Sequence, residues 1–159
     1  MTLNPIKHAP GDAALGEILA LIHEAFAYMD GRIDPPSSMH HLTVEDIARQ
    51  CEIGEVWSIG SPVKACVFLT GKPDCLYLGK MAVSADARGD GLGRALVKIA
   101  EQRAEGLGYT ALELQTRIEL VENHRIFAAL GFVKTLETAH PGYNRPTSIT
   151  MRKPVGQAH

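Results

Sequence analysis

Arg88-Gly89-Asp90-Gly91-Leu92-Gly93 is the stretch that decides the fold of this chain, because it joins an apolar run to an amphipathic segment. Its glycines alternate with other residues, and glycine adopts positive φ readily, which lets successive backbone N–H groups face one ligand. Residues 92–105 have apolar side chains at helical spacing, so the unpaired N–H groups of a helix N-terminus add to the same place. The stretch therefore predicts a loop that binds phosphate groups.

Three classes of phosphate-binding loop fit that description, and the residue spacing separates them. The dinucleotide motif Gly-x-Gly-x-x-Gly/Ala fails, because Arg94 or Leu96 occupies its last position, depending on the glycine from which it is counted. The P-loop fails as well, since no Gly-Lys-Ser/Thr follows. The pattern that remains is Arg-x-x-Gly-x-Gly, preceded by a predicted strand that ends in Lys80-Met81-Ala82-Val83.

The other elements follow from hydrophobic periodicity and turn residues. Helices are predicted over residues 12–29, 43–51, 92–105 and 122–130, the first capped by Asp12 and the second by a Thr43 capping box. Strands are predicted over residues 3–9, 55–59, 63–70, 75–83, 111–116, 132–138 and 148–151. The order is β-α-α-β-β-β-α-β-α-β-β, an α/β (α+β) domain whose mixed, mostly antiparallel sheet contains one parallel crossover.

Length and composition restrict the class of protein. The 159 residues fit one domain, residues 1–159, and the formal net charge of -2 argues against a nucleic-acid partner. The cysteines form no CxxC pair and the adjacent His40 and His41 lack a third ligand, so neither a disulfide framework nor a metal site is expected. With no stretch able to span a bilayer and no signal-peptide pattern, the expectation is a cytoplasmic protein without a membrane partner.

Two motifs together resemble those of a known family. The Arg-x-x-Gly-x-Gly loop and the strand before it resemble the acetyl-CoA signature of the GNAT superfamily of N-acetyltransferases. Residues 123–132, with the sequence Asn-His-Arg-Ile-Phe-Ala-Ala-Leu-Gly-Phe, resemble the family's Asn-x-x-x-Tyr-x-x-x-Gly-Phe helix. The resemblance implies the GNAT acyl-CoA N-acyltransferase fold, acetyl-CoA as cofactor, and direct acetyl transfer to a primary amine of a small molecule or peptide in a ternary complex. A homodimer formed through the terminal strands is compatible with the family.

The resemblance also implies a role for each matching residue. Met81, Ala82 and Val83 offer strand backbone groups to the pantetheine arm, and the Met81 N–H faces the tetrahedral oxyanion. The pyrophosphate is surrounded by the segment made of Arg88, Gly89, Asp90, Gly91, Leu92, Gly93 and Arg94. The two arginines could instead be solvated surface charges. Asn123 and Phe127 contact the pantetheine arm, although Asn123 could cap its helix instead or do both.

The catalytic acid and base stay open. Phe127 stands where the family has a tyrosine as general acid, and a phenyl ring cannot donate a proton, so water or Tyr143 is the candidate replacement. Gly79 falls near the family's glutamate base, which leaves Glu113 as a candidate base acting through water. The alternative for Glu113 is a solvent-facing strand residue. Because the family's tyrosine and glutamate are absent from their usual positions, a second function is possible, that of a non-catalytic module that binds or senses acyl-CoA.

Two loops are candidates for the acceptor side. Residues 32–38 lie between the first two helices, where related enzymes build the acceptor pocket, and Arg32 or Ser38 could hold an acceptor carboxylate or amide. Residues 140–146, His-Pro-Gly-Tyr-Asn-Arg-Pro, are dense in aromatic and polar groups. This second loop either closes over the substrate or forms a rigid surface turn.

Overall fold

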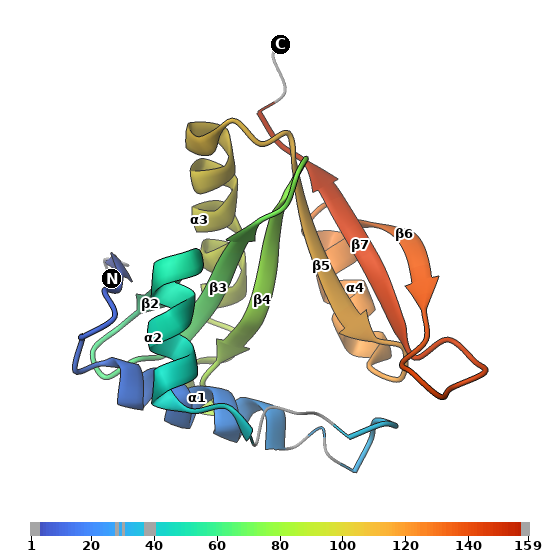
Figure 1. Ribbon diagram of the computed structural model, residues 1–159, viewed down its shortest axis with the longest axis horizontal. Coiled ribbons are helices and arrows are strands. Elements are labelled where there is room, and N and C mark those ends of the chain that lie inside the picture. Colours follow the sequence, from blue (N-terminus) through green and yellow to red (C-terminus); the bar gives the residue numbers. More distant parts are fainter. Residues whose placement is uncertain (1–3, 28, 30, 37–40, 157–159) are drawn as a thin grey trace.

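The computed structural model describes residues 4–27, 29, 31–36 and 41–156, in which a seven-stranded mixed sheet is flanked by helices (Figure 1). The strands are β1 (Pro5–Lys7), β2 (Glu55–Ile59), β3 (Ala65–Gly71), β4 (Leu76–Val83), β5 (Ala111–Arg117), β6 (Val133–Thr138) and β7 (Ser148–Pro154). The helices are α1 (Leu15–Ala27), α2 (Val44–Ile53), α3 (Leu92–Leu107) and α4 (Val121–Ala129), with a 3-10 turn η2 (Ala85–Ala87). The predicted element order and mixed α/β class are confirmed.

The sheet is divided at its parallel pair. The strand order is β1-β2-β3-β4-β5-β7-β6, and β4 with β5 is the parallel neighbour pair within it. These two strands are paired at Leu76 with Leu112 and at Tyr77 with Glu113. Beyond this point they separate, so that the sheet has the outline of an inverted V in Figure 1, with β4 and β5 joined at its apex. By contrast, β5 pairs with β7 along its whole length, so each arm of the V is internally continuous.

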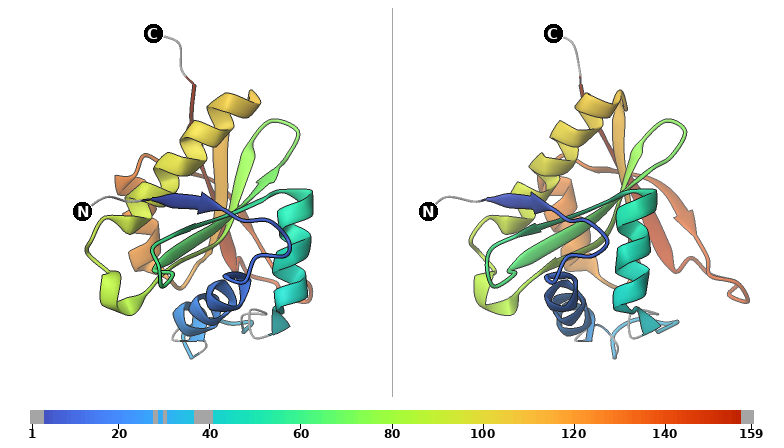
Figure 2. Two further views of the ribbon diagram at one scale, coloured as in Figure 1. Left: turned by 90° about the vertical axis from the view of Figure 1, so that its left-hand side faces the viewer. Right: turned by 60° about the vertical axis from the view of Figure 1, so that its left-hand side comes forward.

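Helices cover both faces of the arm made of β1 to β4. Helix α3 packs on one face through buried Leu96 and Ala100, which join Leu78 in the larger core cluster. Helices α1 and α2 lie on the opposite face (Figure 2). There Ile18 and Ile47 enter a second buried cluster. This burial of apolar side chains on both faces fixes β4, the strand that leads into the glycine loop. No helix within the described ranges is long and apolar enough to cross a membrane.

Helix boundaries lie within two residues of the predicted ones, except at the start of α1. Thr43 accepts a hydrogen bond from the Asp46 N–H and donates its own N–H to the Asp46 carboxylate, so the capping box of α2 is confirmed. Helix α1, however, begins at Leu15 and not at Asp12. The Asp12 carboxylate turns back to the Ala9 N–H at 3.0 Å and to the His8 ring at 2.9 Å, so the predicted cap is wrong.

Candidate functional site

A cavity of about 860 Å³ opens where β4 and β5 part. Its walls come from both strands, the loop before α3, the start of α3, helix α4 and the end of α1. Among the residues predicted to hold a cofactor, those that line it are Met81, Ala82, Val83, Arg88, Gly89, Gly91, Leu92, Gly93, Arg94, Asn123 and Phe127. Asp90, an exposed residue of the same loop, is outside this lining. The structure thus brings two motifs that are distant in sequence into one space.

The glycine loop, residues 88–93, forms the end of this cavity next to the start of α3. Gly89 and Gly91 have φ of +90° and +79°, a region that residues with a side chain rarely adopt. A Cβ placed on either of them, or on Gly93, would meet no protein atom within 4 Å. Gly91 precedes α3 and supplies no side-chain cap, so the first N–H groups of the helix remain available. The loop therefore combines open space, backbone donors and the positive end of the helix dipole, which together suit an anion.

A bulge in β4 shapes the middle of the cavity. Phe68 of β3 pairs with Gly79, while Cys66 pairs with Ala82, so β4 contains one residue more than its partner there. Lys80 absorbs the extra residue with a φ of +50°, which is unusual for a residue with a side chain. The side chain of Lys80 is partly buried, and this burial lowers the pKa of its ammonium group. The bulge coincides with Met81, the residue to which the resemblance gives the oxyanion role.

Tyr77, which the sequence analysis did not single out, lies where the two strands part. It lines the cavity together with Gly79 and Gln115. A Cβ on Gly79 would come within 3.6 Å of the Tyr77 ring, so the ring extends along β4 over the glycine. Burial raises the pKa of Tyr77, and a hydrogen bond from the Gln115 backbone partly opposes it. The Gln115 backbone belongs to β5, which is distant from Tyr77 in the sequence, so no sequence motif identified Tyr77.

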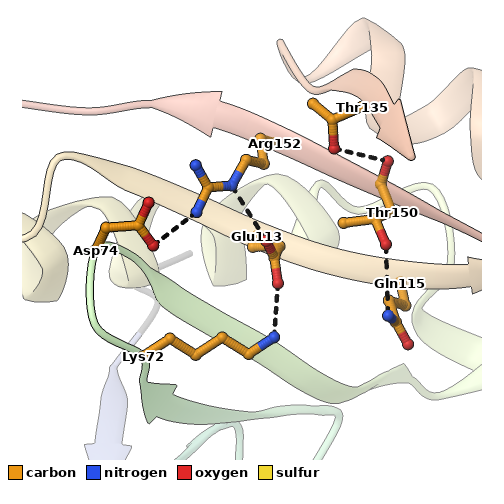
Figure 3. Close-up of polar contacts among 7 residues, drawn as sticks. All are labelled: Lys72, Asp74, Glu113, Gln115, Thr135, Thr150 and Arg152. Atoms are coloured by element: carbon orange, nitrogen blue, oxygen red, sulfur yellow. Dashed lines mark hydrogen bonds and ion pairs between the residues drawn. The ribbon is translucent and has the colours of Figure 1, made fainter.

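Glu113, the candidate base, belongs to an ion-pair network beside the cavity (Figure 3). Lys72 Nζ lies 2.7 Å from one carboxylate oxygen and Arg152 Nε lies 3.1 Å from the other, while Arg152 also contacts Asp74. Burial raises the pKa of Glu113, but the Lys72 hydrogen bond and both cations outweigh it and hold the pKa below its usual value. With 14 % of the side chain exposed, Glu113 is not the solvent-facing residue of the alternative prediction.

The loop between α1 and α2 is tied to the other arm of the V. Arg32 contacts Glu122 of α4 through two hydrogen bonds, of 2.5 and 2.9 Å. The Tyr143 hydroxyl donates to Asp34 at 2.6 Å, and Arg145 Nη2 lies 2.8 Å from the other Asp34 oxygen. The candidate acceptor ligand Arg32 and the candidate acid Tyr143 therefore already have partners within the chain, and Tyr143 is outside the cavity lining among the described residues.

Replacing Asp34 with alanine tests this connection. We expect a small drop in melting temperature, because both contacts are largely exposed and exposed ion pairs contribute little. The apparent KM for the acceptor should rise a few-fold while the Kd for CoA stays constant, since the loop is remote from the glycine loop. Asp86→Ala, which removes another exposed ion pair with Lys64, is the matched control. A changed CoA affinity with an unchanged acceptor KM would contradict this role.

The structure also bears on the predictions for Asn123, for the loop residues Ser38 and His40, and for a metal site. Asn123 lies inside the first turn of α4, whose N-cap is Leu120, so the capping alternative for Asn123 is wrong. Ser38 and His40 lie outside the described residues. Within the described ranges, no group of three or more histidine, cysteine or acidic side chains could hold a metal.

The loop of residues 140–146 reaches the cavity through His140, which was not predicted individually as a site residue. His140 lines the cavity, and its Nδ1 lies 2.5 Å from the Thr147 hydroxyl.

Comparison with known proteins assigns the family. Residues 21–132 match the model of the Acetyltransferase (GNAT) family. The chain belongs to the GNAT family. An uncharacterised N-acetyltransferase of Schizosaccharomyces pombe is 34% identical over 76 residues, which are 48% of this chain and 44% of that relative. The match thus spans less than half the length of the relative.

Solved GNAT structures share the fold. The PaiA N-acetyltransferase of Thermoplasma acidophilum, in complex with coenzyme A, has a TM-score of 0.79 at 12% identity and covers 97% of this chain and 99% of its own. The ribosomal-protein-S18-alanine N-acetyltransferase of Escherichia coli has a TM-score of 0.68 at 20% identity, with 98% and 97% covered. At these identities the likeness confirms the GNAT fold, and the family supports acyl transfer from acetyl-CoA in general.

Proposed function

We propose that this protein transfers the acetyl group of acetyl-CoA to a primary amine of a small molecule or peptide, by direct attack in a ternary complex. The observation that carries the proposal is the cavity between β4 and β5, because it joins the glycine loop, the bulged strand and α4 in one space. A cavity with a phosphate-binding end and a partly apolar middle suits a cofactor that carries a pyrophosphate and a pantetheine arm.

Each part of the cavity has a proposed role toward the donor. The backbone amides from Arg88 to Arg94 would bind the pyrophosphate, with the guanidinium groups adding positive charge. Backbone groups of Met81 and Val83 would bind the pantetheine amides from one side. Asn123 and Phe127 would contact the arm from the other side, because both residues of α4 face the same cavity.

The reaction sets three chemical requirements. The attacking amine must be neutral, although a free alkyl amine has a pKa of about 10. The tetrahedral intermediate needs a hydrogen-bond donor, for which we propose the Met81 N–H at the bulge. The departing thiolate must receive a proton, because a thiol has a pKa of about 8.5.

A second candidate function is a non-catalytic module that binds or senses acyl-CoA. Phe127 and Gly79 favour it, because they occupy the positions at which the resemblance implies an acid and a base. The same cavity would then hold the cofactor without turnover.

One experiment separates the two functions. The protein is incubated with acetyl-CoA and a panel of small amines and peptides, free thiol is measured, and CoA binding is measured by calorimetry. We expect binding and thiol release with at least one class of amine. Binding without release over the whole panel would support the sensing module, and absence of CoA binding would contradict both functions.

The cellular location and the oligomeric state of the protein are also proposals. The three cysteines are free thiols, which supports a reducing, cytoplasmic environment. Val133 and Leu136 of the edge strand β6 are 64% and 56% exposed, which supports a homodimer formed through the terminal strands.

A further inference from the structure

Acetyl transfer must deliver a proton to the departing sulfur, and Phe127 offers no hydroxyl for it. We propose that Tyr77 is the proton donor of this site, a role that rests on the proposed acetyl transfer. Tyr77 lines the cavity at the point where β4 and β5 separate, so its hydroxyl lies between the two arms of the V.

The parting of the strands explains how the hydroxyl is held. Tyr77 and Glu113 form the last described pair of the parallel ladder, and the same register would place Leu78 opposite Leu114 and then Gly79 opposite Gln115. The strands separate before that pair forms, which leaves the Gln115 N–H without a strand partner. The Tyr77 oxygen accepts a hydrogen bond from this N–H. Because the oxygen is thus an acceptor, its own proton remains to be donated into the cavity.

The surroundings keep the phenol in its protonated form and leave room beside it. Burial raises the pKa of Tyr77, and the nearby Glu113 carboxylate acts in the same direction, whereas Lys72 and the Gln115 backbone oppose them. Lys72 Nζ lies 4.4 Å from the ring centroid and fixes the ring through a cation–π contact. Gly79 lacks a side chain next to the ring, so a ligand can approach this edge of the phenol.

The proton balance closes within the reaction. The amine nitrogen forms a bond to the acetyl carbon, and the carbon–sulfur bond breaks. The Tyr77 O–H bond breaks as the S–H bond of CoA forms. The phenolate then regains a proton from the protonated nitrogen of the product, through solvent in the cavity. The amine has lost one proton, CoA has gained one, and Tyr77 is unchanged.

The other tyrosine hydroxyls of the described chain fit this role less well. Tyr143 donates its proton to Asp34, and Tyr109 contacts Gly71 in a separate hollow near the end of α3. Tyr109 is therefore a suitable control, because removing its hydroxyl changes an equally partly buried phenol at a place outside the cavity.

The test is Tyr77→Phe, measured with acetyl-CoA and an amine that the wild type acetylates. The ring and its contact with Lys72 remain, so we expect the fold and the Kd for CoA to be retained. The kcat should fall by roughly a hundredfold, the lower range for loss of a positioned acid, with the KM for acetyl-CoA changed by less than about threefold. Tyr109→Phe should keep the wild-type kcat.

A second measurement reports on the proton itself. A fluorinated tyrosine at position 77 lowers the phenol pKa and should move the alkaline fall of kcat to lower pH, an effect that a purely structural ring would not produce. An active wild type with equal kcat in Tyr77→Phe, or an unmoved pH profile in the fluorinated protein, overturns the role of Tyr77 alone. A wild type that binds CoA but acetylates no amine overturns both this role and the proposed transfer.

Discussion

Replacing Gly93 with glutamate is expected to weaken CoA binding by at least about a hundredfold. Gly93 lies in the first turn of α3 and lines the cavity, and a Cβ there would meet no protein atom within 4 Å. The new side chain therefore occupies ligand space without a clash in the free protein, and its charge repels phosphate, an effect of several kcal/mol for like charges brought together. Calorimetric titration with CoA measures the loss, and thermal unfolding should show a fully folded variant.

Gly106 gives the matched control for this substitution. It lies in the same helix and also has open space around its Cβ position, but it does not line the cavity. Gly106→Glu should bind CoA like the wild type. Equal affinity in both variants would show that the start of α3 does not bind the cofactor.

Replacing Glu113 with glutamine is expected to lower the free energy of unfolding by about 2 kcal/mol, within the range for hydrogen bonds between charged groups. The change removes a largely buried carboxylate that joins Lys72 of the β3–β4 hairpin to Arg152 of β7. Both cations lose this counter-charge, and Arg152 keeps its ion pair with Asp74. Thermal or urea unfolding measures it. Glu137→Gln, which removes a more exposed ion pair with Lys134, should change stability by less than about 1 kcal/mol.

The pH dependence of this loss has a defined sign. The folded pKa of Glu113 is below its ordinary value of 4.5, so its stabilising contribution is fully present above about pH 4.5. The contribution is lost as the pH falls through the folded pKa, so the difference in free energy of unfolding between wild type and Glu113→Gln should become smaller in acid.

The same variant tests whether Glu113 is the catalytic base. At a temperature where both proteins are folded, we expect the kcat of Glu113→Gln to lie within about threefold of the wild type. A loss near a hundredfold would instead identify Glu113 as the base.

The local parts of the fold could be predicted from the sequence. The glycine loop, the capping box of α2 and the glycine that ends α4 depend on residues within a few positions of one another, and the element order followed from them. The start of α1 could not be predicted in the same way. Asp12 has the chemistry of a cap, but His8 and the Ala9 N–H compete for its carboxylate in the folded chain.

The residues proposed to bind the cofactor could also be named from the sequence, because they belong to two short motifs. The side-chain contacts around the candidate acid and base residues could not be predicted, because they join positions that are far apart in the sequence. Glu113 meets Lys72 across 41 residues and Arg152 across 39, and Tyr143 meets Asp34 across 109. Tyr77 reads as an ordinary strand residue until the separation of β4 from β5 leaves the Gln115 N–H for its hydroxyl.

The loop between α1 and α2 connects the arms of the V a second time, at the end of the cavity opposite the β4–β5 pairing. Besides its charged contacts, Ile33 of this loop packs with Met29 and with Leu120 of the other arm. The two arms are thus joined by strand pairing at one end of the cavity and by side-chain contacts of residues 29 and 32–34 at the other. In the proposed transfer, we therefore expect extended peptide ends and slender amines to be acetylated in preference to amines on the broad surface of a folded protein.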